Sequence, residues 1–189
     1  MSRVLVYGGT GFVGSKIVEK LALQGLNVVA ISRRGHCPVF LEKQRANLPW
    51  LENVSWTAGD VSKPDEEQLK TASAVITTVG SPPLPTFSPE AFDHAVFMNG
   101  RANASLISAL EPNGVKKFTL VSAHIPWILK SEKFGYYVGK RLALEAAEDF
   151  SKSSKDSSVT VLQPSGIYGV RHLDNGFGLP LHWYIRIFL

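Results

Sequence analysis

Apolar residues gather in short runs along the chain, and stretches with helical spacing separate these runs. Val4-Leu5-Val6 is a continuous apolar run typical of a buried strand. Val13, Ile17 and Leu21 follow at i, i+4 and i+8, which indicates one face of a helix. Further apolar runs predict strands at Asn27–Ser32, Val54–Ala58, Ala74–Thr78, Phe118–Val121 and Val159–Gln163. Helical patterns lie between them at Asp65–Thr71, Pro89–Leu110 and Tyr136–Phe150.

The connection between the first strand and the first helix is rich in glycine. Residues 7–14 read Tyr-Gly-Gly-Thr-Gly-Phe-Val-Gly, so Gly8, Gly11 and Gly14 have the spacing G-x-x-G-x-x-G. In a phosphate site the first glycine permits a tight turn, the second lets the backbone approach a pyrophosphate, and the third lets helix and strand pack closely. The N–H groups of the helix N-terminus then face the anion. The alternative is an ordinary turn, but the flanking strand and helix favour a dinucleotide site.

Strands that alternate with helices predict a parallel sheet with right-handed crossovers. With the glycine loop after the first strand, we expect the doubly wound α/β order 3-2-1-4-5-6 of the Rossmann type. A ligand is expected at the switch point, between the first and fourth strands. The predicted nucleotide-binding domain covers residues 1–176, and the apolar segment 177–189 follows it.

Composition narrows the possible partners. A length of 189 residues corresponds to about one domain, and 44% apolar with 19% charged residues is typical of a globular protein. The net charge of +4 is spread along the chain, so no nucleic-acid partner is expected, whereas an anionic cofactor or an acidic membrane surface would fit. No metal-ligand spacing occurs, and no metal is predicted. The single Cys37 favours a reducing compartment.

Two further expectations concern a membrane span and a leader peptide. No run approaches the ~20 apolar residues that a membrane-spanning helix needs. The first strand follows Met1 almost at once, so no leader peptide is expected, although removal of a presequence would leave the same pattern.

The end of the second strand bears on the choice of cofactor. A site that prefers NAD usually carries an Asp or Glu there, bonded to the ribose 2′-hydroxyl. This chain instead has Ser32-Arg33-Arg34, which favours the 2′-phosphate of NADP(H) over NAD(H) because guanidinium groups bind phosphate bidentately. Two solvated loop arginines are the alternative. Asp60-Val61, after the third strand, is expected near the adenine, although Asp60 could also cap the following helix.

Several segments together resemble the atypical short-chain dehydrogenase/reductase (SDR) superfamily. The glycine loop is followed in order by Ser-Arg, Gly-Asp-Val, Thr-Val-Gly, Phe-Thr-Leu-Val-Ser, Gly-Tyr-Tyr-Val-Gly-Lys-Arg and Leu-Gln-Pro-Ser-Gly-Ile-Tyr-Gly. The later motifs are most similar to a mitochondrial and plastid branch. That branch includes the yeast ubiquinone-biosynthesis accessory SDR and the NADPH-binding SDR subunit of respiratory complex I.

The resemblance implies cofactor contacts beyond the three glycines. They fall at Thr10, Phe12, Val13, Ser32, Arg33, Arg34, Asp60, Val61, Thr78, Val79, Gly80, Asn99, Lys140 and Pro164. For Asn99, on the longest predicted helix, an ordinary packing role is the alternative.

The resemblance also implies catalytic groups. Tyr136 and Lys140 form Tyr-x-x-x-Lys and share one helical face. In the superfamily the tyrosine exchanges a proton with the substrate oxygen, a nearby ammonium favours its phenolate, and the same lysine holds the nicotinamide ribose. Ser122 matches the serine that hydrogen-bonds the substrate carbonyl. Tyr137 and Arg141 are a rival pair with the same spacing, and incidental packing of Tyr136 and Lys140 is a further alternative.

One departure from the family pattern concerns the substrate region. Family members continue well past the sixth strand, whereas this chain ends at Leu189, so most of that region is expected to be missing. Either the chain is a fragment or it has lost catalysis. The tail 177–189 is mostly apolar and could contact a membrane surface, pack on a partner subunit or fold back over the nucleotide. Pro180 would allow a helix to begin there.

Two functions follow from the resemblance. The favoured one is an NADP(H)-binding accessory subunit of a mitochondrial membrane assembly, respiratory complex I, on the matrix side of the inner membrane. The alternative is an active NADPH-dependent reductase or isomerase-type enzyme that acts on a carbonyl of an isoprenoid-quinone-related substrate. A plastid or cytoplasmic location is the alternative to the mitochondrion.

Overall fold

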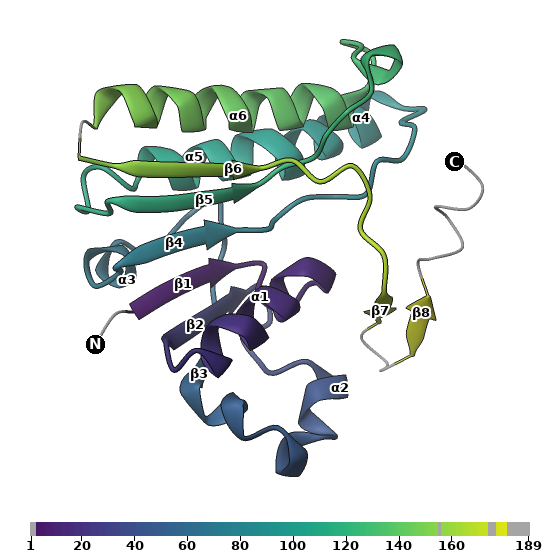
Figure 1. The fold of residues 1–189 in the computed structure, drawn as a ribbon. Coiled ribbons are helices and arrows are strands. Elements are labelled where there is room, and N and C mark those ends of the chain that lie inside the picture. The colour runs from purple at the N-terminus through teal and green to yellow at the C-terminus, as the bar shows by residue number, and fades with distance from the viewer. Residues whose placement is uncertain (1–2, 155, 174–176, 181–189) are drawn as a thin grey trace.

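The parallel sheet has the predicted strand order. A computed structural model describes residues 3–154, 156–173 and 177–180. Its main sheet has the order β3-β2-β1-β4-β5-β6, with all strands parallel (Figure 1). The strands are β1 (Arg3–Tyr7), β2 (Asn27–Ser32), β3 (Val54–Ala58), β4 (Ala74–Thr77), β5 (Lys117–Val121) and β6 (Ser158–Leu162). The order reverses between β1 and β4, where a doubly wound sheet binds its ligand.

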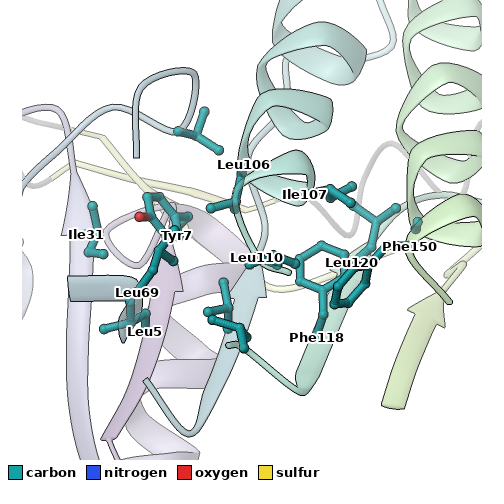
Figure 2. Packing of buried hydrophobic residues seen from close by; sticks show 14 of the residues in the cluster. Leu5, Tyr7, Ile31, Leu69, Leu106, Ile107, Leu110, Phe118, Leu120 and Phe150 are labelled. Carbon is teal, nitrogen blue, oxygen red and sulfur yellow. The ribbon is translucent and has the colours of Figure 1, made fainter. Parts of the chain in front are cut away.

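Helices cover both faces of this sheet. Alternate strand residues point to opposite faces, and since both sets are apolar, each face has a core of its own. Leu5 and Tyr7 belong to a core shared with α3 (Glu66–Lys70), α5 (Ala102–Ser108) and α6 (Gly135–Ser153) (Figure 2). Val4 and Val6 belong to a second core, formed with α1 (Phe12–Leu23), α2 (Val39–Glu42) and the 3₁₀ helix η2 (Pro49–Asn53). Two apolar faces explain why the central strands are continuous apolar runs.

The longest predicted helix contains an irregular turn. It consists of α4 (Pro89–Val96), the π-helical turn η3 (Phe97–Arg101) and α5. A π-helical turn adds one residue to the repeat and is found frequently at functional sites. In this protein it contains Asn99.

Several elements differ in detail from the expected ones. The segment between β2 and β3 contains α2, the 3₁₀ helix η1 (Arg45–Asn47) and η2. Asp65 caps α3 through the N–H groups of Glu67 and Gln68, so this helix begins one residue later than expected. The fully buried residues of α1 are Gly14, Ser15, Val18 and Ala22, and the expected Ile17 and Leu21 are half-buried and pack against the same core. Helix α6 continues to Ser153, beyond the expected end at Phe150.

The chain after β6 returns toward the glycine loop. Strands β7 (Val170–His172) and β8 (Gly178–Pro180) form an antiparallel pair, and the His172 ring stacks on Phe40 of α2 at 4.0 Å. Pro180 ends β8, and a helix that begins after it would lie outside the described residues. The rest of the tail, 181–189, lies outside the described residues. Within the described ranges no helix has both the length and the apolar character needed to cross a bilayer.

Candidate functional site

The glycine loop joins β1 to α1 with backbone contacts. Gly8 has φ +79°, a conformation that favours glycine, and its N–H donates to Ile31 C=O at 2.9 Å. A Cβ on Gly14 would overlap the Gly8 carbonyl oxygen, so glycine is required where the first turn of α1 crosses the loop. The first and third glycines are therefore explained by the fold alone.

Gly11 has a different explanation. Its backbone angles, φ −74° and ψ 175°, are open to any residue, and the one close neighbour of an added Cβ would be Gly8 O at 3.1 Å. Gly11 is the N-cap of α1 and is exposed. The fold thus demands glycine less strongly there than at Gly8 or Gly14, because this contact is tight without being an overlap, whereas a pyrophosphate approaching the N–H groups of the helix N-terminus would require it. The loop fits the phosphates of a dinucleotide.

Hydrogen bonds of Thr77 and Thr78 hold the segment after β4 against the glycine loop and the helix behind it. The Thr78 hydroxyl donates to Tyr7 C=O at 3.1 Å and to Gly8 C=O at 3.2 Å. Thr77 and Asn103 are both fully buried, the Thr77 hydroxyl donates to Asn103 Oδ1 at 2.7 Å, and Asn103 Nδ2 donates to Val79 C=O at 3.2 Å. The Thr78 side chain therefore supports the loop. Asn103 was missed as a site residue, although Asn99 and Asn103 share a helical face.

Four predicted residues meet beside this segment and are here called the Lys140 cluster: Gly80, Asn99, Tyr136 and Lys140. A Cβ built on Gly80 would lie 2.7 Å from Asn99 Oδ1 and 3.3 Å from Lys140 Nζ. Lys140 Nζ lies 5.7 Å from the centroid of the Tyr136 ring. These residues come from the end of β4, the π-helical turn and α6, and their meeting is a product of the tertiary structure.

Asn99 has a defined supporting role in this cluster. Its amide is fully buried, with Nδ2 donating to Ser81 Oγ at 2.7 Å and to Ala95 C=O at 3.0 Å. Its Oδ1 accepts from Ser81 N–H at 3.2 Å. Asn99 thus fixes the loop after β4 against the helix. The packing role considered for it is present, and a contact with the cofactor stays a prediction.

Glycines let the two helices approach closely enough to form the cluster. A Cβ on Gly139 of α6 would lie 2.7 Å from Asn99 Cβ, and a Cβ on Gly100 would lie 2.7 Å from Gly139 C=O. Gly135 faces Phe92 and Ala95 in the same way. The glycines of Gly-Tyr-x-x-Gly-Lys therefore set how near Lys140 comes to β4.

Lys140 is an unusual charge in this environment. Its side chain is 8% exposed, and within the described part of the chain it makes no ion pair. Burial lowers its pKa to about 8 because desolvation penalises the ammonium. Burial also raises the pKa of the Tyr136 phenol. Burial thus shifts both groups toward their neutral forms, and the ammonium-stabilised phenolate stays a prediction.

The rival pair has different surroundings. Arg141 lies over the Tyr137 ring at 5.9 Å and forms ion pairs with Glu132 at 3.0 Å and Glu145 at 3.6 Å. The Arg141 charge is thus compensated by carboxylates. Among the described residues the Lys140 ammonium has no such carboxylate, and it lies near Gly80 just after β4, which favours Tyr136 and Lys140 as the reactive pair.

The remaining catalytic candidate lies at the end of β5. Ser122 is buried, and its N–H donates to Leu162 C=O of β6 at 2.8 Å. Pro164, just beyond β6, accepts from His124 N–H at 3.0 Å. These contacts join the ends of β5 and β6 at the same edge of the sheet as the Lys140 cluster. The roles of Ser122 and Pro164 stay predictions.

The predicted adenine end of the site is more exposed. Arg33 and Arg34 are exposed beyond β2, and Ser32 Oγ accepts from Gly35 N–H at 3.2 Å. Asp60 Oδ1 accepts from the N–H and hydroxyl of Ser62, both at 2.8 Å. These bonds, with a smaller contribution from Arg33, lower the pKa of Asp60. Asp60 forms a local turn and does not cap α3, so that alternative is wrong.

Other parts of the predicted site can also be located. The side chain of Val61 is buried in the core, and Val79 packs against that core. Thr10, Phe12 and Val13 are half-buried at the start of α1. A shallow depression of about 470 Å³ on α4, lined by Pro89, Glu90, Asp93, His94 and Phe97, contains no predicted site residue. The described residues hold no cluster of three potential metal ligands.

Comparison with known proteins identifies the family. A model described as NAD(P)H-binding matches residues 8–171. The chain belongs to this NAD(P)H-binding family. The match extends from the glycine loop to β7 and includes the Lys140 cluster. With the observed sheet order, this makes the chain an NAD(P)-binding protein with an SDR-like fold.

Relatives and solved structures extend this result. The chain is 39% identical over 184 residues to an uncharacterized chloroplastic protein of Arabidopsis thaliana, covering 95% of this chain and 55% of that protein. It is 36% identical over 80 residues to MIOREX complex component 2 of Saccharomyces cerevisiae, covering 41% of this chain and 28% of that protein. The chain thus spans about half or less of the length of these relatives.

The structural likeness concerns the fold. A Bacillus cereus UDP-glucuronic acid 4-epimerase solved with UDP-glucuronic acid and NAD has a TM-score of 0.71 and 20% identity, over 89% of this chain and 58% of that one. Gre2 of Candida albicans, solved with NADPH, has a TM-score of 0.69 and 17% identity, over 94% and 61%. One neighbour was solved with NAD and the other with NADPH, so the likeness does not distinguish the two cofactors.

Proposed function

We propose that the chain binds NADP(H) and uses Tyr136, Lys140 and Ser122 to reduce a carbonyl group. The observation that carries this proposal is the Lys140 cluster. A buried lysine without a carboxylate partner costs stability, and within the described residues its ammonium contacts the Tyr136 ring at 5.7 Å but forms no ion pair. A ligand with hydroxyl and phosphate oxygens at the end of β4 would supply the missing partners.

The residues have separate parts in this proposal. The α1 N-terminus and Gly11 would hold the pyrophosphate, Arg33 and Arg34 the 2′-phosphate, and Lys140 the nicotinamide ribose. A bound nicotinamide supplies the hydride. Ser122 would hydrogen-bond the substrate carbonyl, and the Tyr136 phenol would donate its proton to the same oxygen. Because burial raises the pKa of that phenol, it is protonated at neutral pH and suited to act as an acid.

A second candidate is an accessory subunit that keeps a bound NADP(H) without turnover. The yeast relative is a named component of a complex, which favours membership of a larger assembly. The plant relative is chloroplastic, which favours an organelle. We retain a mitochondrial assembly such as respiratory complex I, and a quinone-related carbonyl substrate for the active form, as specific versions of these two proposals.

One experiment separates the two functions. Calorimetry with NADPH, followed by absorbance at the reduced-nicotinamide band with quinones, aldehydes and ketones, should show binding and then oxidation of NADPH. Binding with no oxidation, together with co-purification in a larger complex, would replace the first proposal with the second. Absence of any NADPH or NADH binding by the folded chain would contradict both.

A further inference from the structure

A turn just before α6 exposes a row of apolar side chains. The 3₁₀ helix η4 (Trp127–Leu129) follows Pro126, and its Trp127 and Ile128 are 82% and 71% exposed. Leu129 is also exposed. Nothing among the described residues covers them, although burial of each would be favourable. We call Pro126–Lys133 the Trp127 turn.

Four of the seven backbone N–H groups of residues 127–133 have partners within the turn. Leu129 N–H donates to Pro126 C=O at 2.9 Å, Lys130 N–H to Trp127 C=O at 3.1 Å and Ser131 N–H to Leu129 C=O at 3.0 Å. Lys133 N–H donates to Ser131 Oγ at 3.2 Å. A segment that enters the apolar edge of a bilayer must leave few backbone groups without partners. The Trp127 turn meets this condition in part, through the paired N–H groups of Leu129, Lys130 and Ser131.

The charged residues around the turn favour contact with an anionic surface. Lys130 and Lys133 are exposed, and within the described ranges neither forms an ion pair. The nearby Glu132 is compensated by Arg141 at 3.0 Å. Residues 122–131 contain no Asp or Glu. Apolar side chains flanked by two uncompensated lysines complement the interface of a membrane with anionic headgroups, where tryptophan is also favoured.

The loop after β4 also exposes apolar side chains. β4 and β5 pair in parallel, so the segments after them leave the same edge of the sheet. The segment after β4, residues 81–88, has no charged side chain and carries Phe87, which is 95% exposed, and Leu84. We propose that the Trp127 turn, together with Leu84 and Phe87 from the loop after β4, docks this protein on an anionic lipid surface. The docked edge is the one that carries Ser122 and Tyr136.

Vesicle binding by the full chain tests this docking. Binding to phosphatidylcholine vesicles should strengthen when phosphatidylglycerol is added. The Trp127→Ser/Ile128→Ser variant should weaken partitioning about tenfold or more. The matched control is Leu23→Ser, an exposed leucine at the far end of α1. Likewise Lys130→Glu/Lys133→Glu should remove the phosphatidylglycerol dependence, whereas Lys20→Glu/Lys43→Glu should keep most of it. Equal binding by the Trp127 variant and the wild type would overturn the proposal.

Fluorescence identifies the inserting segment. Lipids brominated on the acyl chain should quench the wild type and the Trp183→Phe variant, whereas Trp127→Phe should lose most of the quenching. The opposite pattern would assign membrane contact to the segment 177–189 and would overturn docking by the Trp127 turn.

Gel filtration without lipid tests whether this surface instead contacts a second copy of the chain. If Trp127→Ser/Ile128→Ser abolishes a dimer but leaves vesicle binding unchanged, the surface contacts a second copy and the proposal is wrong.

Discussion

The glycine loop and the Lys140 cluster lie at the same edge of the sheet, but they are built in opposite ways. The loop consists of consecutive residues whose functional groups are backbone N–H groups, and it buries no charge. The cluster brings together three separate segments and buries an ammonium group for which the described residues supply no carboxylate partner. The loop therefore costs the fold little, whereas the cluster is assembled against a desolvation penalty.

This contrast shows which parts of the site depend on the ligand. Gly8 and Gly14 are required by the fold, so their presence says little about function. Gly11 and Lys140 are not explained by the fold alone. Substitutions in each pair test whether Gly11 and Lys140, unlike Gly8 and Gly14, are present in order to bind a nucleotide.

The largest expected effect is on chemistry in the Lys140 cluster. Tyr136→Phe removes only the hydroxyl and should lower turnover by about 10²–10⁴-fold, the range for a lost general acid, while NADPH affinity is kept. Steady-state and binding measurements on the same preparation check this. Tyr137→Phe is the matched control and should leave turnover nearly unchanged. If Tyr137→Phe is the damaging change, the assignment of the reactive face of α6 is wrong.

The next effect concerns the loop. Gly11→Val places a side chain between backbone and pyrophosphate, so nucleotide affinity should fall by about 10²-fold or more with little change in Tm. Gly14→Ala should behave differently, because its Cβ would overlap Gly8 O and the protein should lose stability. Calorimetry and thermal melts measure both. A Gly11→Val protein that melts like the wild type and still binds NADPH normally would remove the basis for a phosphate site.

Lys140→Met tests the cost of the buried charge. Because burial lowers the pKa of Lys140 from 10.5 to about 8, the unfolded chain binds more protons between these values, and wild-type stability should rise with pH across that window. Lys140→Met should flatten this rise and stabilise the nucleotide-free protein at pH 7 by about 1–3 kcal/mol. Urea unfolding at several pH values measures it. A less stable variant at pH 7 would mean that the lysine has a structural partner.

The smallest expected effect is at the adenine end. Arg33→Ala and Arg34→Ala should each weaken NADPH binding about tenfold, because each removes a charge-assisted bond to the 2′-phosphate. NADH has no such phosphate and should bind almost as before. Parallel titrations with both nucleotides make the comparison. Equal wild-type affinity for NADH and NADPH would contradict the choice of NADP(H).

The sequence predicted most of the fold because its signals were local and strong. β2 and β3 have the predicted bounds, and the sheet order follows from the position of the glycine loop. Of the expected α1 face, Ile17 and Leu21 pack half-buried against the core, whereas Ser15 on the same helix is buried without being apolar, so an apolar pattern does not find it. The π-helical turn at Phe97–Arg101 was missed because one added residue hardly changes a helical pattern.

By itself the sequence determined the strand-helix alternation, the phosphate-type loop and the candidates Tyr136 and Lys140, because each is a pattern of neighbouring residues. The tertiary structure decided which candidates meet. It placed Lys140 Nζ beside Gly80 through the close approach of Gly100 and Gly139, and it compensated Arg141 with Glu132 and Glu145. It also left Trp127 and Ile128 exposed. Burial and pairing depend on residues distant in sequence, so the physical character of Lys140 emerges only when the helices pack.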